Sequence, residues 1–199
     1  MGGVRISRRR FVTAGAVGTL GALLAPEAVL ADDNQPERIR WDFVAFGGKH
    51  VEPGGADVSS DSATADTITL TGSGFANVDE GNARGGGTFV HKTASQTFSG
   101  VYYVTGFKSF ENPGGTLAGL GLTDDIGPID RTTGGDLSVR VHAVATDGSG
   151  LSADGTLGVH CRLPGGVGTE PEGFSLTVDS PSFHFVQKSG ATLFHVLKN

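Results

Sequence analysis

Residues 137–145, LSVRVHAVA, alternate apolar and polar side chains with a period of two. In an extended strand this period places Val139 on one face and His142 on the other. Residues 156–163, TLGVHCRL, repeat the pattern, with Cys161 on the apolar face. Two such strands on either side of a Gly-rich turn predict a hairpin with one dry face and one polar face, which makes the chain an all-β protein.

The rest of the chain extends this pattern. Period-two or aromatic-rich runs alternate with clusters of Gly, Asp, Ser and Pro, and no apolar stripe at helical spacing is found. Candidate strands lie at 39–46, 67–72, 87–92, 100–110, 137–145, 156–163, 174–179, 182–188 and 192–198. Short strands joined mainly by tight turns predict a single antiparallel barrel of about eight strands, with a β-sandwich as the alternative.

Three connections between the strands are long, at 47–66, 112–136 and 164–173, and the last is expected to form a turn. Residues 47–66 are acidic and small, and are expected to form a solvated loop that could include an edge strand. Residues 112–136 hold several Leu and Ile side chains among glycines. A loop of this length in a compact domain is often functional, so we expect a flap across one end of the β structure.

The N-terminus contains the arginine pair Arg8 and Arg9, followed by Phe11, a weakly apolar run and small residues up to Ala31. It resembles a twin-arginine export signal. The alternative is a membrane anchor, but the run is shorter than the ~18–20 residues of a spanning helix. The resemblance implies passage through the twin-arginine translocase and cleavage by signal peptidase after residue 31. The expected organisation is then a signal peptide (1–31), a tail (32–37) and one barrel domain (38–199), exported to the cell envelope, periplasm or medium without a stable membrane span.

Charge and cysteine content restrict the partners. The formal net charge is −6, and loss of the predicted signal peptide leaves 11 basic and 20 acidic residues, a charge of −9. Nucleic acids and anionic membrane surfaces are therefore not expected as partners. Cys161 is the only cysteine, so no intramolecular disulfide can form, and its place on the apolar face predicts burial.

Histidines on predicted strands suggest one candidate site. In SFHFVQKSGATLFHVLKN (182–199), a two-residue turn at Ser189-Gly190 would place two histidines opposite each other, and the 137–163 hairpin would pair two more. The four candidate ligands of a transition metal are His142, His160, His184 and His195, with Asp42 or His91 as a further ligand. No H-x-H, H-E-x-x-H or C-x-x-C signature is present, so the alternative is that these histidines make ordinary polar contacts. No other cofactor is expected, and without a G-x-S-x-G elbow no catalytic residue is assigned.

Aromatic residues suggest a second candidate site. A closed barrel of about eight strands can hold a small molecule in its mouth. Trp41, Phe43, Tyr103 and Phe107 are the candidate ligand-binding residues, with the 112–136 flap above them. Other aromatics that could line such a cavity are Phe89, Phe183, Phe185 and Phe194. The alternative is that these rings only fill the core.

The segments RWDF (40–43), TITLTGSG (67–74), GGTF (86–89) and VYYVTG (101–106) give the domain a loose similarity to dirigent and allene-oxide-cyclase-like barrels. The resemblance concerns the fold and carries no functional residues across. The expected function is binding of a small apolar molecule outside the cytoplasm. The alternatives are a barrel cyclase, isomerase or metal-dependent enzyme that uses the strand histidines, and a structural or interaction protein of the envelope.

Overall fold

The computed structural model describes residues 38–61 and 63–197, so the predicted signal peptide and tail lie outside the described residues. Within this part the chain is nearly all β, as predicted. The strands are β1 (Arg38–Gly47), β2 (His50–Pro53), β3 (Asp57–Asp61), β4 (Thr67–Leu70), β5 (Ser73–Asn77), β6 (Asn82–Lys92), β7 (Thr97–Glu111), β8 (Thr123–Asp124), β9 (Thr132–Thr133), β10 (Gly135–Ala145), β11 (Ser152–Cys161), β12 (Gly173–Val178), β13 (Phe183–Ser189) and β14 (Thr192–Val196). A short 3-10 turn, η1 (Ile129–Arg131), precedes β9. No helix among the described residues is long and apolar enough to cross a membrane.

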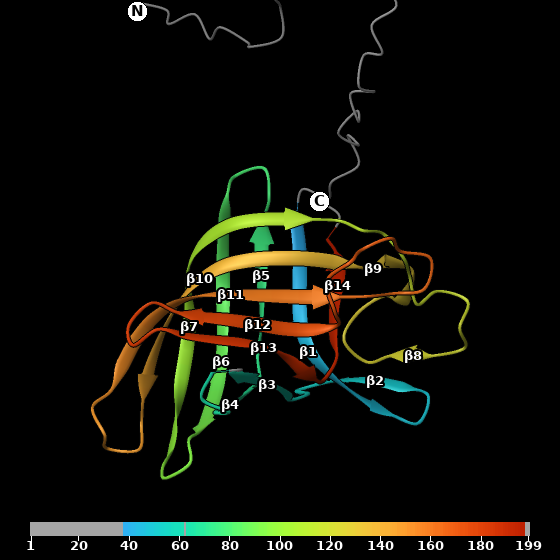
Figure 1. Ribbon diagram of the computed structural model, residues 1–199. Coiled ribbons are helices and arrows are strands. Elements are labelled where there is room, and N and C mark those ends of the chain that lie inside the picture. Colours follow the sequence, from blue (N-terminus) through green and yellow to red (C-terminus); the bar gives the residue numbers. More distant parts are fainter. Residues whose placement is uncertain (1–37, 62, 198–199) are drawn as a thin grey trace, which may run out of the picture. The chain divides into compact units, whose positions relative to one another are not determined.

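Eight antiparallel strands close into a barrel. They pair in the order β3-β13-β12-β11-β10-β7-β6-β4, and β4 pairs back to β3. The predicted barrel is therefore confirmed over the sandwich. A branch of further strands, β5, β1, β14 and β9, continues from β6, while β2 pairs with β1 and β8. Figure 1 shows the long, curved β7 and β10 across one side of this barrel.

The β10–β11 hairpin has the predicted sidedness with a different register. Val139 pairs with Leu157, and both are fully buried, so the dry face is confirmed. The predicted pairing of His142 with His160 is wrong, because β11 begins at Ser152 and not at residue 156. The shorter turn shifts the register, and His142 lies opposite Asp154.

The predicted C-terminal hairpin does not form. β13 pairs with β12 and β3, whereas β14 pairs with β1 and β9. Gly190 has a φ of 132°, and a Cβ there would lie 1.8 Å from the Asp57 carboxylate. The same carboxylate accepts a hydrogen bond from Ala191 N at 2.8 Å. The chain therefore continues from β13 in the barrel to β14 in the branch and does not reverse into a hairpin, so His184 does not face His195.

The acidic segment 47–66 also differs from the expected solvated loop. It contains β2 and β3, and β3 (DVSSD) is a full member of the barrel. Asp57, Ser59 and Asp61 are buried on its inner side. Ser59 Oγ donates to the carbonyl oxygen of Phe174 at 2.8 Å, which satisfies one of these polar groups inside. An inward face of Asp and Ser lacks the apolar alternation by which strands are identified.

The packed part of the core lies around β1 and β14. Trp41, Phe43, Phe174 and Phe194 have no solvent-exposed area. The rings of Trp41 and Phe43 meet edge to face with centroids 6.0 Å apart, and Phe43 meets Phe174 in the same way at 5.7 Å. All four residues Thr192 to His195 are buried, so β14 is covered on both faces.

Candidate ligand-binding site

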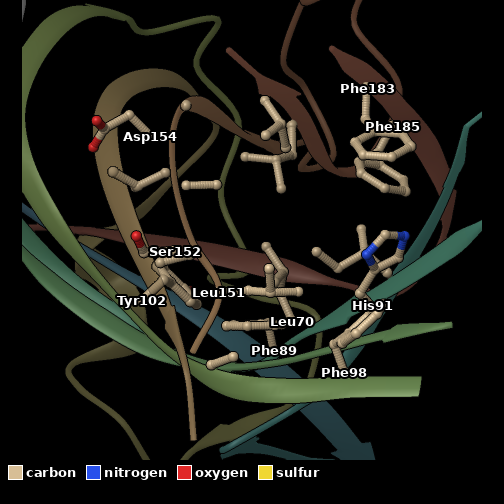
Figure 2. A pocket seen from close by; sticks show the side chains of 18 of the residues that line it. Leu70, Phe89, His91, Phe98, Tyr102, Leu151, Ser152, Asp154, Phe183 and Phe185 are labelled. Atoms are coloured by element: carbon tan, nitrogen blue, oxygen red, sulfur yellow. The ribbon is translucent and has the colours of Figure 1, made fainter. Parts of the chain in front are cut away.

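A cavity of about 340 Å³ opens at one end of the barrel (Figure 2). Thr93, Leu151 and Pro181, at its mouth, belong to the turns that join β6 to β7, β10 to β11 and β12 to β13. The wall is formed mainly by aliphatic and aromatic side chains from seven strands: Ile68, Leu70, Phe89, Phe98, Tyr102, Val141, Ala143, Ala145, Ala153, Leu157, Leu176, Val178, Phe183 and Phe185.

The alternation of the strands places these side chains inside. Ile68 pairs with His91 and Leu70 with Phe89, so two alternate residue pairs of β4 and β6 face the cavity. On any strand, residues two apart share a face, and the intervening side chains point away from the interior. The wall is therefore rigid and mostly apolar.

Several polar residues at the wall are engaged elsewhere. The Tyr102 hydroxyl donates to the carbonyl oxygen of Thr71 at 3.0 Å. The Asp154 carboxylate is mostly exposed and pairs with His142 Nδ1 at 2.7 Å on the outer face. Thr93 Oγ1 bonds within its own turn. None of these groups is free to bind a molecule in the cavity.

His91 is the exception. Its Nε2 lies 3.3 Å from Asp66 Oδ2, and both side chains are largely buried. The imidazole is packed among the rings of Phe98, Phe183 and Phe185, with centroids 5.4–6.0 Å away (Figure 2). His91 Nδ1 makes no hydrogen bond to any described residue and is not among the fully buried atoms without a partner.

The four predicted ligand-binding residues do not line this cavity. Trp41 and Phe43 are enclosed in the packed core, and Phe107 packs against that core. Tyr103 lies on the outside of β7, 47% exposed, with its ring against His142. The parity of β7 places Tyr102, and not Tyr103, on the inside. Of the wider aromatic set, Phe89, Phe183 and Phe185 do line the cavity.

The four candidate metal ligands also lie apart. Among the described residues, no three His, Cys, Asp or Glu side chains are placed to hold a metal ion. His142 pairs with Asp154, His160 with Asp136 at 2.8 Å, and His195 with Asp124 at 2.7 Å. Within the described part of the chain, the His184 ring has only contacts of 3.4 Å to two hydroxyls. The expected convergence depended on the two hairpin registers that the structure corrects. Asp42 is paired with Arg40, and His91 with Asp66.

The 112–136 segment is not a lid on the cavity, since none of its residues lines it. It lies on the side of the barrel away from the turns at the mouth (Figure 1) and covers the outer face of β1 and β14. There Asp124 and His195 form a buried pair, and Arg40 Nη1 donates to the carbonyl oxygen of Ile126 at 3.3 Å. Burial raises the pKa of the nearby Asp42 carboxyl, although Arg40 opposes the shift.

A second group of acids lies inside the barrel. Asp57 is fully buried, and burial raises its pKa to about 7; the Ala191 N–H opposes this shift and Glu172 adds to it. Burial also raises the pKa of Glu172 itself. Cys161 is buried, as predicted, and burial raises the pKa of its thiol. Asp57 pairs in register with Leu70, which lines the cavity, so Asp57 lies next to the cavity wall.

From sequence, His91 was expected only as a further ligand of the candidate metal site, and Asp66 was not expected in any site. They are separated by 24 intervening residues, and only the β4–β6 register brings them together. The one available signal was His91 at an inward position of an otherwise apolar strand end. No protein-family model, no curated protein and no solved structure matches the chain.

Proposed function

We propose that this protein is exported and binds a small, largely apolar molecule in the end cavity of the barrel. The observation that carries the proposal is the cavity itself, about 340 Å³ in volume with an aliphatic and aromatic wall. Ligand cavities range over about 300–1,000 Å³ and combine apolar walls with a few polar groups. The volume is at the small end of that range and suits a molecule smaller than most drugs.

The interior of the barrel supports this proposal because one part of it is packed and another part is an open cavity. Trp41 and Phe43 are fully buried in the core, while the side chains around Phe89 and Phe185 leave a cavity. Native cores normally leave few voids larger than a water molecule, since each lost contact costs stability. A retained apolar cavity with an open mouth therefore favours a binding role. The histidines that carried the enzyme alternative lie apart, so no second function is proposed.

Binding of 4-propylanisole, a neutral apolar probe, tests the proposal by isothermal titration calorimetry. Ala143→Phe places a ring in the cavity and is expected to weaken binding at least tenfold, or about 1.4 kcal/mol. Val144→Phe is the matched control, because Val144 is the next residue of β10, outside the cavity lining, and pairs with the exposed Val101. Equal affinity in both variants, or no binding to the unaltered protein, would contradict the proposal.

A further inference from the structure

We infer that His91 selects the ligand, and that the cavity takes a neutral apolar molecule with one hydroxyl group, of the class of an alkylphenol or a terpenoid alcohol. The inference rests on the proposed function and goes further by naming the chemical class. It follows from the arrangement of Asp66, His91 and three phenylalanine rings at the cavity wall.

The first step is that His91 holds the one free polar nitrogen of the wall among the described residues. The tyrosine, aspartate and threonine groups there are engaged elsewhere, as described above. Ser152 is exposed. Since buried polar groups require partners, a ligand that fills this space would be expected to supply one for His91 Nδ1.

The second step concerns which partner His91 Nδ1 would take. The carboxylate of Asp66 accepts a hydrogen bond from Nε2–H, and a hydrogen bond at one ring nitrogen fixes the tautomer of a neutral imidazole. The proton is then on Nε2, so Nδ1 presents a lone pair. A lone pair accepts a hydrogen bond, and the complementary ligand group is a donor such as a hydroxyl.

The third step excludes a carboxylate ligand. Among the residues whose side chains the structure describes, no Lys or Arg lines the cavity, and Asp66 is the acidic side chain paired with the imidazole. A ligand carboxylate would place a second negative charge near Asp66 in an apolar surrounding, which is costly without a cationic partner. The formal net charge of −6 also disfavours the approach of anions.

The fourth step is that the ring of His91 is held in place. Phe183 and Phe185 meet it at 74° and 85°, both edge to face. An acceptor nitrogen whose position is fixed by three rings and one carboxylate discriminates between ligands, because little entropy is lost when the hydrogen bond forms.

Two isomers test the inference at pH 8: 4-butylphenol, which has a hydroxyl donor, and 4-propylanisole, which has none. By calorimetry the phenol is expected to bind the purified protein about fivefold more tightly, the value of one net hydrogen bond of about 1 kcal/mol. His91→Phe keeps an aromatic ring in the cluster and is expected to bring the two affinities together. His50→Phe is the matched control, since His50 also pairs with an aspartate, Asp125, but lies at the surface and should leave the ratio unchanged.

A second measurement uses the unaltered protein. The ¹⁵N resonance of His91 Nδ1 is expected at the position of an unprotonated ring nitrogen, and should shift on addition of 4-butylphenol and not of 4-propylanisole. Equal affinities for the isomers, a preference that survives His91→Phe, or tighter binding of 4-propylbenzoate than of either would overturn the inference. If 4-propylanisole binds but the phenol has no advantage, only the inference fails; if neither binds, the proposed function fails with it.

Discussion

Replacing Asp57 by asparagine is expected to stabilise the protein, relative to the unaltered chain, progressively as the pH rises from about 4 to about 8. The folded protein raises the pKa of Asp57 from 3.8 to about 7, mainly through burial. Below 3.8 the carboxyl is protonated in both the folded and the unfolded chain and has no effect on stability. Between 3.8 and 7 the unfolded chain ionises first, so stability falls as the pH rises, and the loss is complete above 7.

The magnitude follows from the same two values. Each pH unit between 3.8 and about 7 is worth about 1.36 kcal/mol, so ionisation of Asp57 costs the folded state up to about 4 kcal/mol at pH 8. Asparagine does not ionise, and its side-chain oxygen can still accept the hydrogen bond from Ala191 N. Urea unfolding followed by circular dichroism at several pH values gives the difference in unfolding free energy between variant and unaltered protein.

Asp61→Asn is the control on the same strand. Three backbone N–H groups, those of His184, Thr64 and Ala63, lower the pKa of Asp61, so its contribution to stability is present above 3.8 and lost as the pH falls through the lowered value. The difference for Asp61→Asn should therefore stay flat from pH 5 to 8. A flat difference for Asp57→Asn over this range, or one of opposite sign, would refute the argument that burial keeps Asp57 protonated.

Three further predictions concern other parts of the chain. Changing Arg8 and Arg9 to lysine is expected to abolish export, with the uncleaved protein kept in the cytoplasm, as immunoblotting of cell fractions would show; continued export would contradict the proposed signal. Asp124→Ala, which leaves a buried imidazole without its partner, should cost about 3 kcal/mol of unfolding free energy, whereas its exposed neighbour variant Asp125→Ala should cost less than about 1 kcal/mol. Equal costs would show that burial does not decide the strength of these pairs. Cys161 should not react with a maleimide until urea unfolds the protein, and fast labelling of the native state would contradict its burial.

The barrel was predictable from sequence wherever one face of a strand is apolar. The sidedness of β10 and β11 follows directly from their alternation. β3 could not be found in this way, because its inward residues are Asp57, Ser59 and Asp61. Their burial depends on partners from distant parts of the chain, such as the Phe174 carbonyl oxygen.

The candidate site was less predictable than the fold. Alternation states which residues share a face, but the register between strands decides which of them meet. The β10–β11 turn is shorter than predicted, and the chain continues through Gly190 from β13 to β14 without forming a hairpin. These two differences changed the partners of all four candidate metal ligands. Likewise, alternation cannot tell which aromatic side chains fill the core and which border a cavity, so Trp41 and Phe43 were chosen where Phe89 and Phe185 form the wall.

The place of Trp41 has a practical consequence for spectroscopy. It is the only tryptophan of the chain, it has no solvent-exposed area, and its Nε1 has no hydrogen-bond partner within residues 38–61 and 63–197. Indole emission should therefore lie at short wavelength in the native state and move to long wavelength when the core opens. Because Trp41 does not border the cavity, this emission offers an optical signal of folding that a bound molecule leaves largely unaltered.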